Sequence, residues 1–468
     1  MKYLITGLLL ALALHSHSKI WLVDPNGTYK SPHAVRNLVA DGDTIEIEAA
    51  IYKNHPQTYF YKNNLLIRGI NGRPRLEGGA TLAGNANGKA IFVVNGDDCH
   101  VHNIEFANAS VPDLNGAGIR QEGCDLLITN CYFRGNEMGI LGGNYSNCKV
   151  TIEYCVFTNN GNPKRPGFQH NVYINHIDTL LFQYNLTYDA SAEGHELKSR
   201  ARNNIIRYNY IANINSGDSR NIDLPNGGTS ILLGNVIEQG ENSVNSGLIG
   251  YGLEGLDNPA PHNIWLVNNT IINRKSKGNF VNVHTGTDTV TLRNNILVGA
   301  KTSGLVIGNP AKLDSSSNLV SNDVSAPKFG PLSGMKYMID KQSPCLNKGA
   351  SLSASPLGYS LVPTLQYSDT ASHVARFKDQ TIDIGAYEYK GGVGIERFNG
   401  TMVQRLNSSL VYPNPLNDGE LRLLQSSQTV APFEVYNASG QFVYGGVFLN
   451  GYSKLDLRPG LYWIKIEG

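Results

Sequence analysis

The sequence predicts an all-β protein, in which a single-stranded right-handed parallel β-helix precedes a small C-terminal antiparallel β-sandwich. Three observations lead to this fold class. Glycine fills 50 of the 468 positions and charged residues make up only 16%, which is typical of a chain with many turns and short strands. A phrase that ends in asparagine or cysteine recurs about every 25 residues. The last segment alternates apolar and polar residues around turn residues, as antiparallel strands do.

The charge and the hydrophobic content exclude two classes of protein. Lys and Arg number 39 and Asp and Glu 38, so the formal net charge is +1, without the basic excess of a nucleic-acid-binding protein. Hydrophobic residues make up 41% of the chain, which is too many for a disordered protein. We therefore expect a folded β-rich protein, a monomer that does not bind nucleic acid.

Residues 1–18 have the pattern of a secretory signal peptide. Lys2 precedes an apolar run over residues 3–14, which is too short to span a bilayer as a helix, and Ser16 and Ser18 are small residues suited to a cleavage site. The alternative for this segment is a buried N-terminal strand. No later stretch has the run of about 18 apolar residues that a membrane helix needs, so we expect no transmembrane segment in the mature chain.

A repeated phrase organises the middle of the chain. Each copy has alternating apolar residues, which indicate a strand, followed by Asn or Cys and a second apolar pair. The copies are anchored at Ile104, Cys131, Cys155, Asn185, Asn209, Asn235, Asn269, Asn295 and Asn318. A period near 25 residues with two or three short strands is typical of a right-handed parallel β-helix, in which each coil hydrogen-bonds to its neighbours.

The recurrent asparagine suits a bend at which the side-chain amide caps backbone groups in coil after coil, which is a structural role. Leucine-rich repeats fit poorly, because no helical pattern separates the strands. We assign residues 19–390 to the β-helix, with a short helix that begins at Ser31 and Pro32 as its N-terminal cap and a strand over residues 44–47 after it. Irregular sequence over residues 320–389 is expected to cover the C-terminal end.

Two pairs of cysteines share the spacing of the repeat. Cys124 and Cys148 are 24 residues apart, and so are Cys131 and Cys155. We expect these residues to stack in successive coils as small buried hydrophobic groups. Disulfides are the alternative in an exported protein, and metal binding is less favoured because no Cys-x-x-Cys pair occurs.

The segment after residue 390 changes in character. Residues 391–410 read as a linker, and residues 411–468 as a small antiparallel sandwich that opens with Tyr412-Pro413-Asn414-Pro415 and ends near Gly460-Leu461-Tyr462. These two features resemble the type A C-terminal sorting domain of the type IX secretion system of Bacteroidetes. The resemblance implies Sec export followed by type IX secretion, with release or attachment at the outer-membrane surface. A generic carbohydrate-binding sandwich is the alternative.

Three polar residues 25 apart hold the same position in successive coils: Tyr173, Lys198 and Asp223. Their neighbours in sequence are apolar or small and should point inward, so the three should form a ladder on the outer surface, about 4.8 Å from strand to strand. Insertions over residues 161–167 and 252–262 lengthen the coils on both sides and would build a groove. Other polar residues expected along this surface are Asn175, Arg200, Asn171, Glu196, Asn221, His170 and His195.

The segment over residues 194–204, with residues 223–228, resembles secreted bacterial β-helix proteins of the pectate-lyase-like superfamily. Lys198-Ser199 is similar to the strand that carries the base in alginate lyases and chondroitinase-B-like lyases. In that group an arginine on the next coil acts with the lysine, whereas here the matching position is Asp223 and the nearest arginine is Arg220. The resemblance implies a polysaccharide lyase whose partner is an acidic polysaccharide.

Cleavage by β-elimination needs a base, a cation for the uronate carboxylate and an acid for the leaving oxygen. Lys198 is the candidate base, Arg200 or Arg220 would bind the carboxylate, and Tyr173 or His195 would protonate the leaving group. Further residues expected to contact substrate are His170, Asn175, Arg202, Asn226, Tyr251 and Glu254. Asp223 with Glu196 would be the ligands of a Ca²⁺ ion, the one cofactor that the sequence suggests.

Two other functions remain open at this point. A glycoside hydrolase would use paired carboxylates, here Asp223 with Glu196 or Glu254. A non-catalytic surface glycan-binding protein or adhesin would need only the groove. The residues Tyr173, Lys198 and Asp223 would form a solvated salt-bridge ladder if the surface has no function.

Overall fold

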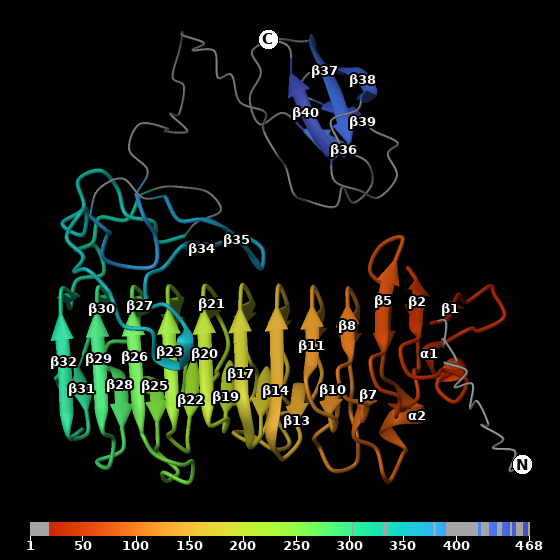
Figure 1. Cartoon of the computed structure of the whole chain (residues 1–468), viewed down its shortest axis with the longest axis horizontal. Helices are drawn as coiled ribbons and strands as arrows, with labels where there is room; N and C mark the ends of the chain where they lie inside the picture. The colour runs from red at the N-terminus through yellow and green to blue at the C-terminus, as the bar shows by residue number, and fades with distance from the viewer. Residues whose placement is uncertain are drawn as a thin grey trace, which may run out of the picture. The chain divides into compact units, whose positions relative to one another are not determined.

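The recurring phrase of the sequence corresponds to coils of a parallel β-helix in the computed structural model (Figure 1). The structure describes residues 18–301, 304–330, 336–377 and 381–389, together with five strands beyond residue 419. The chain divides into two compact units, residues 1–392 and 393–468. The predicted signal peptide, linker and Tyr412–Pro415 motif lie outside the described residues.

Each coil contributes a strand to up to three parallel sheets, which we call A, B and C. Consecutive coils follow one another from red to teal in Figure 1. Sheet A contains β1 (Ile20–Val23), β2 (Thr44–Glu48), β5 (Leu66–Ile70), β8 (His100–His102), β11 (Leu126–Thr129), β14 (Tyr145–Glu153), β17 (Ile177–Gln183), β20 (Asn203–Arg207), β23 (Thr229–Leu233), β26 (Asn263–Val267), β29 (Thr289–Arg293) and β32 (Lys312–Ser316).

Sheets B and C complete the coils. Sheet B contains β3 (Ile51–Tyr52), β6 (Arg75–Glu77), β9 (Glu105–Ala107), β12 (Tyr132–Arg134), β15 (Val156–Thr158), β18 (Leu186–Tyr188), β21 (Tyr210–Ala212), β24 (Val236–Gln239), β27 (Thr270–Asn273), β30 (Ile296–Gly299) and β33 (Leu319–Ser321). Sheet C contains β4 (Thr58–Phe60), β7 (Ala90–Val94), β10 (Ala117–Gln121), β13 (Met138–Gly142), β16 (Val172–Ile174), β19 (Leu197–Ser199), β22 (Ile222–Leu224), β25 (Gly247–Tyr251), β28 (Asn279–Val283) and β31 (Val306–Ile307).

The interior is a continuous apolar column. One side chain in each coil stacks on its equivalent in the next coil: the rings of Phe106, Phe133 and Phe157 lie 5.1 and 4.7 Å apart between centroids in successive strands of sheet B. All three are fully buried. Because each coil rests only on its neighbours, the stack can grow to many coils without a wider core.

The asparagine ladder has the structure that the sequence predicts. The side-chain carbonyl of Asn209 accepts hydrogen bonds from both the backbone N–H and the side-chain amide of Asn185, at 2.9 and 3.1 Å. The same pair of bonds links each later ladder residue to the next, through Asn318. Cys131 and Cys155 hold the equivalent positions in the earlier coils, where the backbone N–H of Cys131 donates to Cys155 Sγ.

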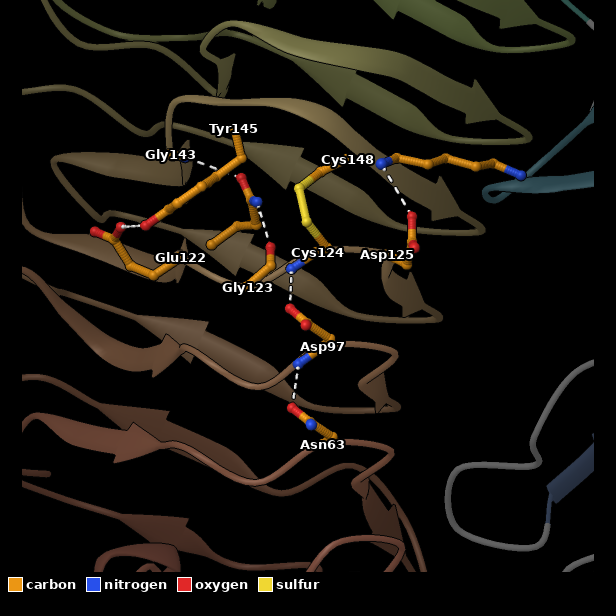
Figure 2. The surroundings of a disulfide bond; sticks show 11 residues. Asn63, Asp97, Glu122, Gly123, Cys124, Asp125, Gly143, Tyr145 and Cys148 are labelled. Carbon is orange, nitrogen blue, oxygen red and sulfur yellow. Dashed lines mark hydrogen bonds between the residues drawn. A yellow bond between two sulfur atoms is a disulfide. The ribbon is translucent and has the colours of Figure 1, made fainter.

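The cysteines correct one expectation. Cys131 and Cys155 are buried free thiols as predicted, but Cys124 and Cys148 form a disulfide (Figure 2). Stacking in register brings their Cα atoms to 4.8 Å, which is within the range that a disulfide spans. The backbone N–H of Cys124 also donates to Asp97 Oδ1 of the preceding coil (Figure 2).

The cap helix and the covering segment differ in extent from the prediction. Helix α1 (Pro32–Val35) is a single turn with Ser31 at its N-cap position, without a side-chain capping bond. A second one-turn helix, α2 (Ala80–Ala83), and a 3-10 turn, η1 (Pro356–Gly358), are the other helical elements of the described residues. No helix among the described residues is long and apolar enough to cross a membrane.

The described residues between 320 and 389 pack against the sides of the coils. Leu313 in β32, the last strand of sheet A, is 48% exposed, so these residues do not cover the C-terminal end as predicted. Tyr337, Ile339 and Tyr367 pack with Tyr210 and Val236 on the outer face of sheet B. This segment also carries the antiparallel pair β34 (Leu365–Ser368) and β35 (Ser372–Ala375). In the second unit, β36 (Glu420–Arg422), β37 (Val430–Asn437), β38 (Phe442–Leu449), β39 (Tyr452–Lys454) and β40 (Tyr462–Ile466) form one antiparallel sheet.

Candidate functional site

The polar ladder lies on the outer face of sheet C, in the register that its spacing predicts. Tyr173 in β16 pairs with Lys198 in β19, Lys198 pairs with Asp223 in β22, and Asp223 pairs with Gly250 in β25. The residues that flank Lys198, Leu197 and Ser199, are buried. The alternation of the strands therefore presents one side chain of each strand to this face.

Lys198 is the centre of the site. Its Nζ donates to Glu254 Oε1 at 2.5 Å and lies 3.4 Å from Asp223 Oδ2. The Lys198 side chain is only 11% exposed, whereas that of Glu254 is 43% exposed. Glu254 belongs to the insertion over residues 252–262, so a segment 56 residues further along the chain reaches over the ladder.

Arg200 is the second cation of the site, and it binds the same carboxylate as Lys198. Its guanidinium donates to the hydroxyl oxygen of Tyr173 at 3.0 Å, to Asn226 Oδ1 at 2.5 Å, and to Glu254 Oε2. Partial burial would raise the pKa of Glu254, but hydrogen bonds from Lys198 and Arg200 outweigh it and hold that pKa below its usual range. Glu254 is therefore a carboxylate at neutral pH.

Asp223 lies on the other side of Lys198 and is almost fully buried. Its Oδ2 is 3.7 Å from His195 Nε2, and its Oδ1 is 4.0 Å from an Arg220 guanidinium nitrogen. Gly250 makes this arrangement possible, because a Cβ at that position would lie 2.8 Å from Asp223 Oδ1 and 3.0 Å from the Arg220 side chain.

Two buried histidines stack on each other beside the ladder. His170 and His195 stack with ring centroids 4.9 Å apart, and the backbone N–H of Arg220 donates to His195 Nδ1 at 3.0 Å. That bond places the proton of a neutral imidazole on Nε2, facing Asp223. Burial lowers the pKa of His195 to about 4, with Asp223 offsetting only part of the effect. Burial also holds the pKa of His170 well below its usual value.

The loop that carries Glu254 is anchored at its base. Asn226 donates to Asp257 Oδ2 at 2.6 Å. The side-chain amide of Asn258 donates to the backbone carbonyls of Arg200, Ala201 and Gly227. Neither Asp257 nor Asn258 was expected from the sequence, since a loop outside the repeat gives no register from which to infer its contacts.

The structure brings together most of the predicted catalytic group. Tyr173, Lys198, Arg200, His195 and Arg220 all contact the ladder or its carboxylates, as do Asn226 and Glu254. His170 lies beneath His195 and is buried. Asn175 is half-buried next to Ile174 of β16, and Arg202 is exposed. Among the described residues, no hydrogen bond or ion pair links the Arg202 side chain to the site.

Two predicted site residues point elsewhere. Tyr251 is fully buried in the core, and its hydroxyl donates to the Gly228 carbonyl. Its strand register explains this, because Tyr251 pairs with the inward-facing Leu224. Glu196 is also fully buried, and its carboxylate accepts hydrogen bonds from Asn171, Thr187 and the backbone of Ala190. Strand β19 begins only at Leu197, so the outward alternation does not extend to Glu196.

The predicted calcium site does not fit this geometry. Glu196 faces the bend after β18 and does not meet Asp223, whose oxygens are surrounded by Lys198, His195 and Arg220. Hydrogen-bond donors and positive charges occupy the positions from which a calcium ion would need oxygen ligands. No cluster of three or more His, Cys, Asp or Glu residues suited to a metal occurs in the part of the chain that the structure describes.

The comparison with solved structures agrees with the fold. The chain is similar to pectate lyase Pel9A with a TM-score of 0.52 and 18% identity, over 80% of this chain and 97% of that chain. The protein thus has the pectate-lyase-like right-handed parallel β-helix fold, which confirms the predicted β-helix. The described strands of the second unit form one antiparallel sheet, where a sandwich was predicted. A mutant of the PL6-family alginate lyase AlyGC gives a TM-score of 0.33 and 14% identity, over 81% of this chain and 59% of that chain. No protein-family model matches the sequence, and no curated protein matches it.

Proposed function

We propose that the protein is a polysaccharide lyase that cleaves uronate-containing glycans by β-elimination on the outer face of sheet C. One observation supports this above the others: Lys198, Arg200 and Tyr173 converge on one partly buried surface, where the Arg200 Nε donates to the Tyr173 hydroxyl at 3.0 Å. A base, a cation for a carboxylate and a proton donor are the three groups that the reaction requires.

In the proposed reaction Lys198, in its neutral form, removes the proton α to the uronate carboxylate. Arg200 binds that carboxylate and stabilises the negative charge that develops on it. The carbon–oxygen bond to the leaving sugar then breaks, a carbon–carbon double bond forms, and Tyr173 donates its hydroxyl proton to the leaving oxygen. The Tyr173 oxygen accepts a hydrogen bond from Arg200, so its own hydrogen is available to the substrate.

His195 and Arg220 act through Asp223 in this proposal. The neutral His195 imidazole and the Arg220 guanidinium lie on either side of the Asp223 carboxylate, and this carboxylate positions Lys198 Nζ from the neighbouring strand. A pKa near 4 for His195 makes it a poorer proton donor to the leaving group than Tyr173, because an imidazole that is already neutral donates weakly.

A glycoside hydrolase is less well supported. It needs one carboxylic acid that stays protonated at the pH of reaction, whereas the pKa of Glu254 is lowered. Burial does raise the pKa of Glu196, but its carboxyl group is enclosed among Asn171, Thr187 and Ala190. The pair Asp223 and Glu254 instead shares the Lys198 ammonium group.

The test is to incubate the protein with alginate, pectate and glycosaminoglycans and to follow the ultraviolet absorbance of unsaturated uronate ends. We expect absorbance with at least one of them, and a loss of about 100-fold or more in rate for Lys198→Met. Reducing ends without this absorbance would indicate a hydrolase. Retention on a glycan without either product would indicate a non-catalytic binding protein, and an active Lys198→Met variant would refute the assignment of the base.

We also propose that the chain is exported and reaches the medium or the outer-membrane surface through type IX secretion. The support is the signal-peptide pattern over residues 1–18 and the motifs near Tyr412 and Gly460. Expression in a type IX-competent host should give extracellular or surface-bound protein whose N-terminus starts near residue 19, and deletion of residues 411–468 should retain it in the periplasm. Export of the truncated chain to the surface would contradict this proposal.

A further inference from the structure

Glu254 places a carboxylate of the chain itself between the two cations of the proposed site. One oxygen accepts from Lys198 Nζ at 2.5 Å and the other accepts from the Arg200 guanidinium. Two cations that share one carboxylate in this way would hold the carboxylate of a uronate unit by the same contacts. The position of Glu254 therefore marks where a carboxylate is bound on this surface.

The Glu254 side chain can leave without unfolding its loop. The base of the loop is held by the Asp257 and Asn258 contacts, and Asn258 is only 8% exposed. The tip differs, because Leu253 is 39% exposed and the Glu254 side chain 43% exposed. Because the Glu254 side chain is this exposed while Lys198 lies beneath it, an incoming carboxylate can reach the two cations from solvent and take its place.

We propose that Glu254 is an internal substitute for the carboxylate of a uronate ligand, and that such a ligand binds by displacing the Glu254 side chain from Lys198 and Arg200. The ligand class rests on the proposed function. A neutral glycan cannot make this exchange, since it brings no charge to replace the one removed from the two cations.

Displacement also connects binding to reaction. The Glu254 carboxylate covers Lys198 and Arg200 in the free protein, so the proposed base and the carboxylate-binding arginine meet a sugar unit only after an acidic glycan has displaced it. Glu254 thus disfavours the binding of neutral glycans and holds the two cations in position in the free protein.

The test compares binding to oligogalacturonate, to oligoalginate and to a neutral cello-oligosaccharide of equal length, measured by titration calorimetry. Removing the competing charge in Glu254→Gln and Glu254→Ala should raise the affinity for a carboxylated oligosaccharide about tenfold, with no gain for the neutral one. The matched control is Glu46→Gln, which breaks the ion pair between Glu46 and Arg68 on sheet A. It removes the same charge far along the coil stack and should leave the affinity unchanged.

Hydrogen exchange gives an independent readout. The Glu254 N–H bonds to the Pro225 carbonyl at 3.0 Å, and a carboxylated ligand should speed the exchange of residues 253–255 while the Asn258 amide stays protected. Slower exchange at the tip on ligand binding, or unchanged or weaker affinity in both Glu254 variants, would overturn the inference.

The outcomes separate the two proposals. Tighter binding by Glu254→Gln without an unsaturated product would support the displacement and refute the lyase. Unsaturated product from the wild type without a gain in affinity would support the lyase and refute the displacement. Failure of wild type and variants alike to bind any carboxylated glycan would refute both.

Discussion

Two polar ladders run along the same stack of coils, and they differ in how their hydrogen bonds are satisfied. In the asparagine ladder every interior member bonds to the equivalent residue of the next coil and to a backbone carbonyl, as Asn235 does with Asn269 and Ile206. In the ladder of Tyr173, Lys198 and Asp223 no two members are the same residue, and Lys198 obtains its shortest contact from Glu254 of an insertion. The first ladder is complete within the repeat, whereas the second depends on residues outside it.

In our proposal this difference separates polar groups that stabilise the fold from polar groups that bind a ligand. A buried amide whose donors and acceptors are all paired stabilises one conformation and has nothing left with which to bind a ligand. Lys198 and Arg200 are paired with the half-exposed Glu254, and they can exchange this carboxylate for one of a ligand. We therefore expect substitutions in the first ladder to change stability and those in the second to change binding, and the following predictions test this contrast.

The largest effect on stability is expected in the middle of the asparagine ladder. Asn235→Ala removes the acceptor of both Asn209 bonds and the donor to Ile206 and Asn269, leaving buried polar groups unpaired. The free energy of unfolding should fall by about 3 kcal/mol, measured by chemical denaturation. The control is Asn318→Ala at the half-exposed end of the ladder, which should cost about 1 kcal/mol. Equal losses at the two positions would contradict the ladder model.

The sequence predicts this part of the fold well because the period itself determines the register. Once residues 25 apart are aligned, Lys198 must lie between Tyr173 and Asp223, and the ladder asparagines must meet. The same register would have placed Tyr251 inward beside Leu224, so that error was avoidable. The direction of Glu196 was not predictable in this way, because β19 is only three residues long and alternation ends before it.

The insertion limits what can be predicted for the site. Its length indicates a loop beside the ladder, but the contact of Glu254 with Lys198 depends on the anchoring of Asp257 and Asn258, for which no repeat supplies a pattern. The disulfide is a related case. Stacking of Cys124 on Cys148 was predicted, and bond formation depends on their separation within the coils.

The second-largest effect is expected at that disulfide. Cys124→Ser with Cys148→Ser opens a covalent loop with a sequence separation of 24 residues and should lower the free energy of unfolding by about 2 kcal/mol, at the lower end of the typical contribution of a disulfide. A thiol reductant should destabilise the wild type to the same extent and leave the double variant unaffected. Cys131→Ala with Cys155→Ala is the matched control, because these ladder thiols are free and their loss should not change the response to reductant.

A smaller effect should appear as a pH dependence from the buried carboxyl groups Glu196 and Asp218. Burial raises the pKa of both, and the charge of Glu196 adds to the rise at Asp218. The folded state then retains protons that the unfolded state releases above pH of about 4, so stability falls as pH rises toward neutral and alkaline values.

Asp218→Asn should therefore gain stability relative to the wild type as pH increases, by about 1–2 kcal/mol between pH 5 and pH 8. The measurement is the free energy of unfolding at each pH by urea denaturation. Glu241→Gln, which removes an exposed carboxyl group on a neighbouring coil, should show no such trend. A constant difference between Asp218→Asn and the wild type would show that the pair does not hold a proton.

The smallest effect is expected at Gly250, which pairs with Asp223 in the next coil of sheet C. A Cβ there would lie 2.8 Å from Asp223 Oδ1 and 3.0 Å from the Arg220 side chain, so the Asp223 carboxyl group must shift and the arginine side chain must give way with it. Gly250→Ala should cost about 1 kcal/mol or less of stability and weaken the binding of acidic glycans a few-fold, measured by calorimetry.

Gly217→Ala, whose added Cβ would have its nearest neighbour at 3.9 Å, should match the wild type. If the loss acts through Arg220, then Gly250→Ala should have almost no further effect in an Arg220→Ala background; additive losses would mean that the added methyl group disturbs Asp223 and Lys198 directly.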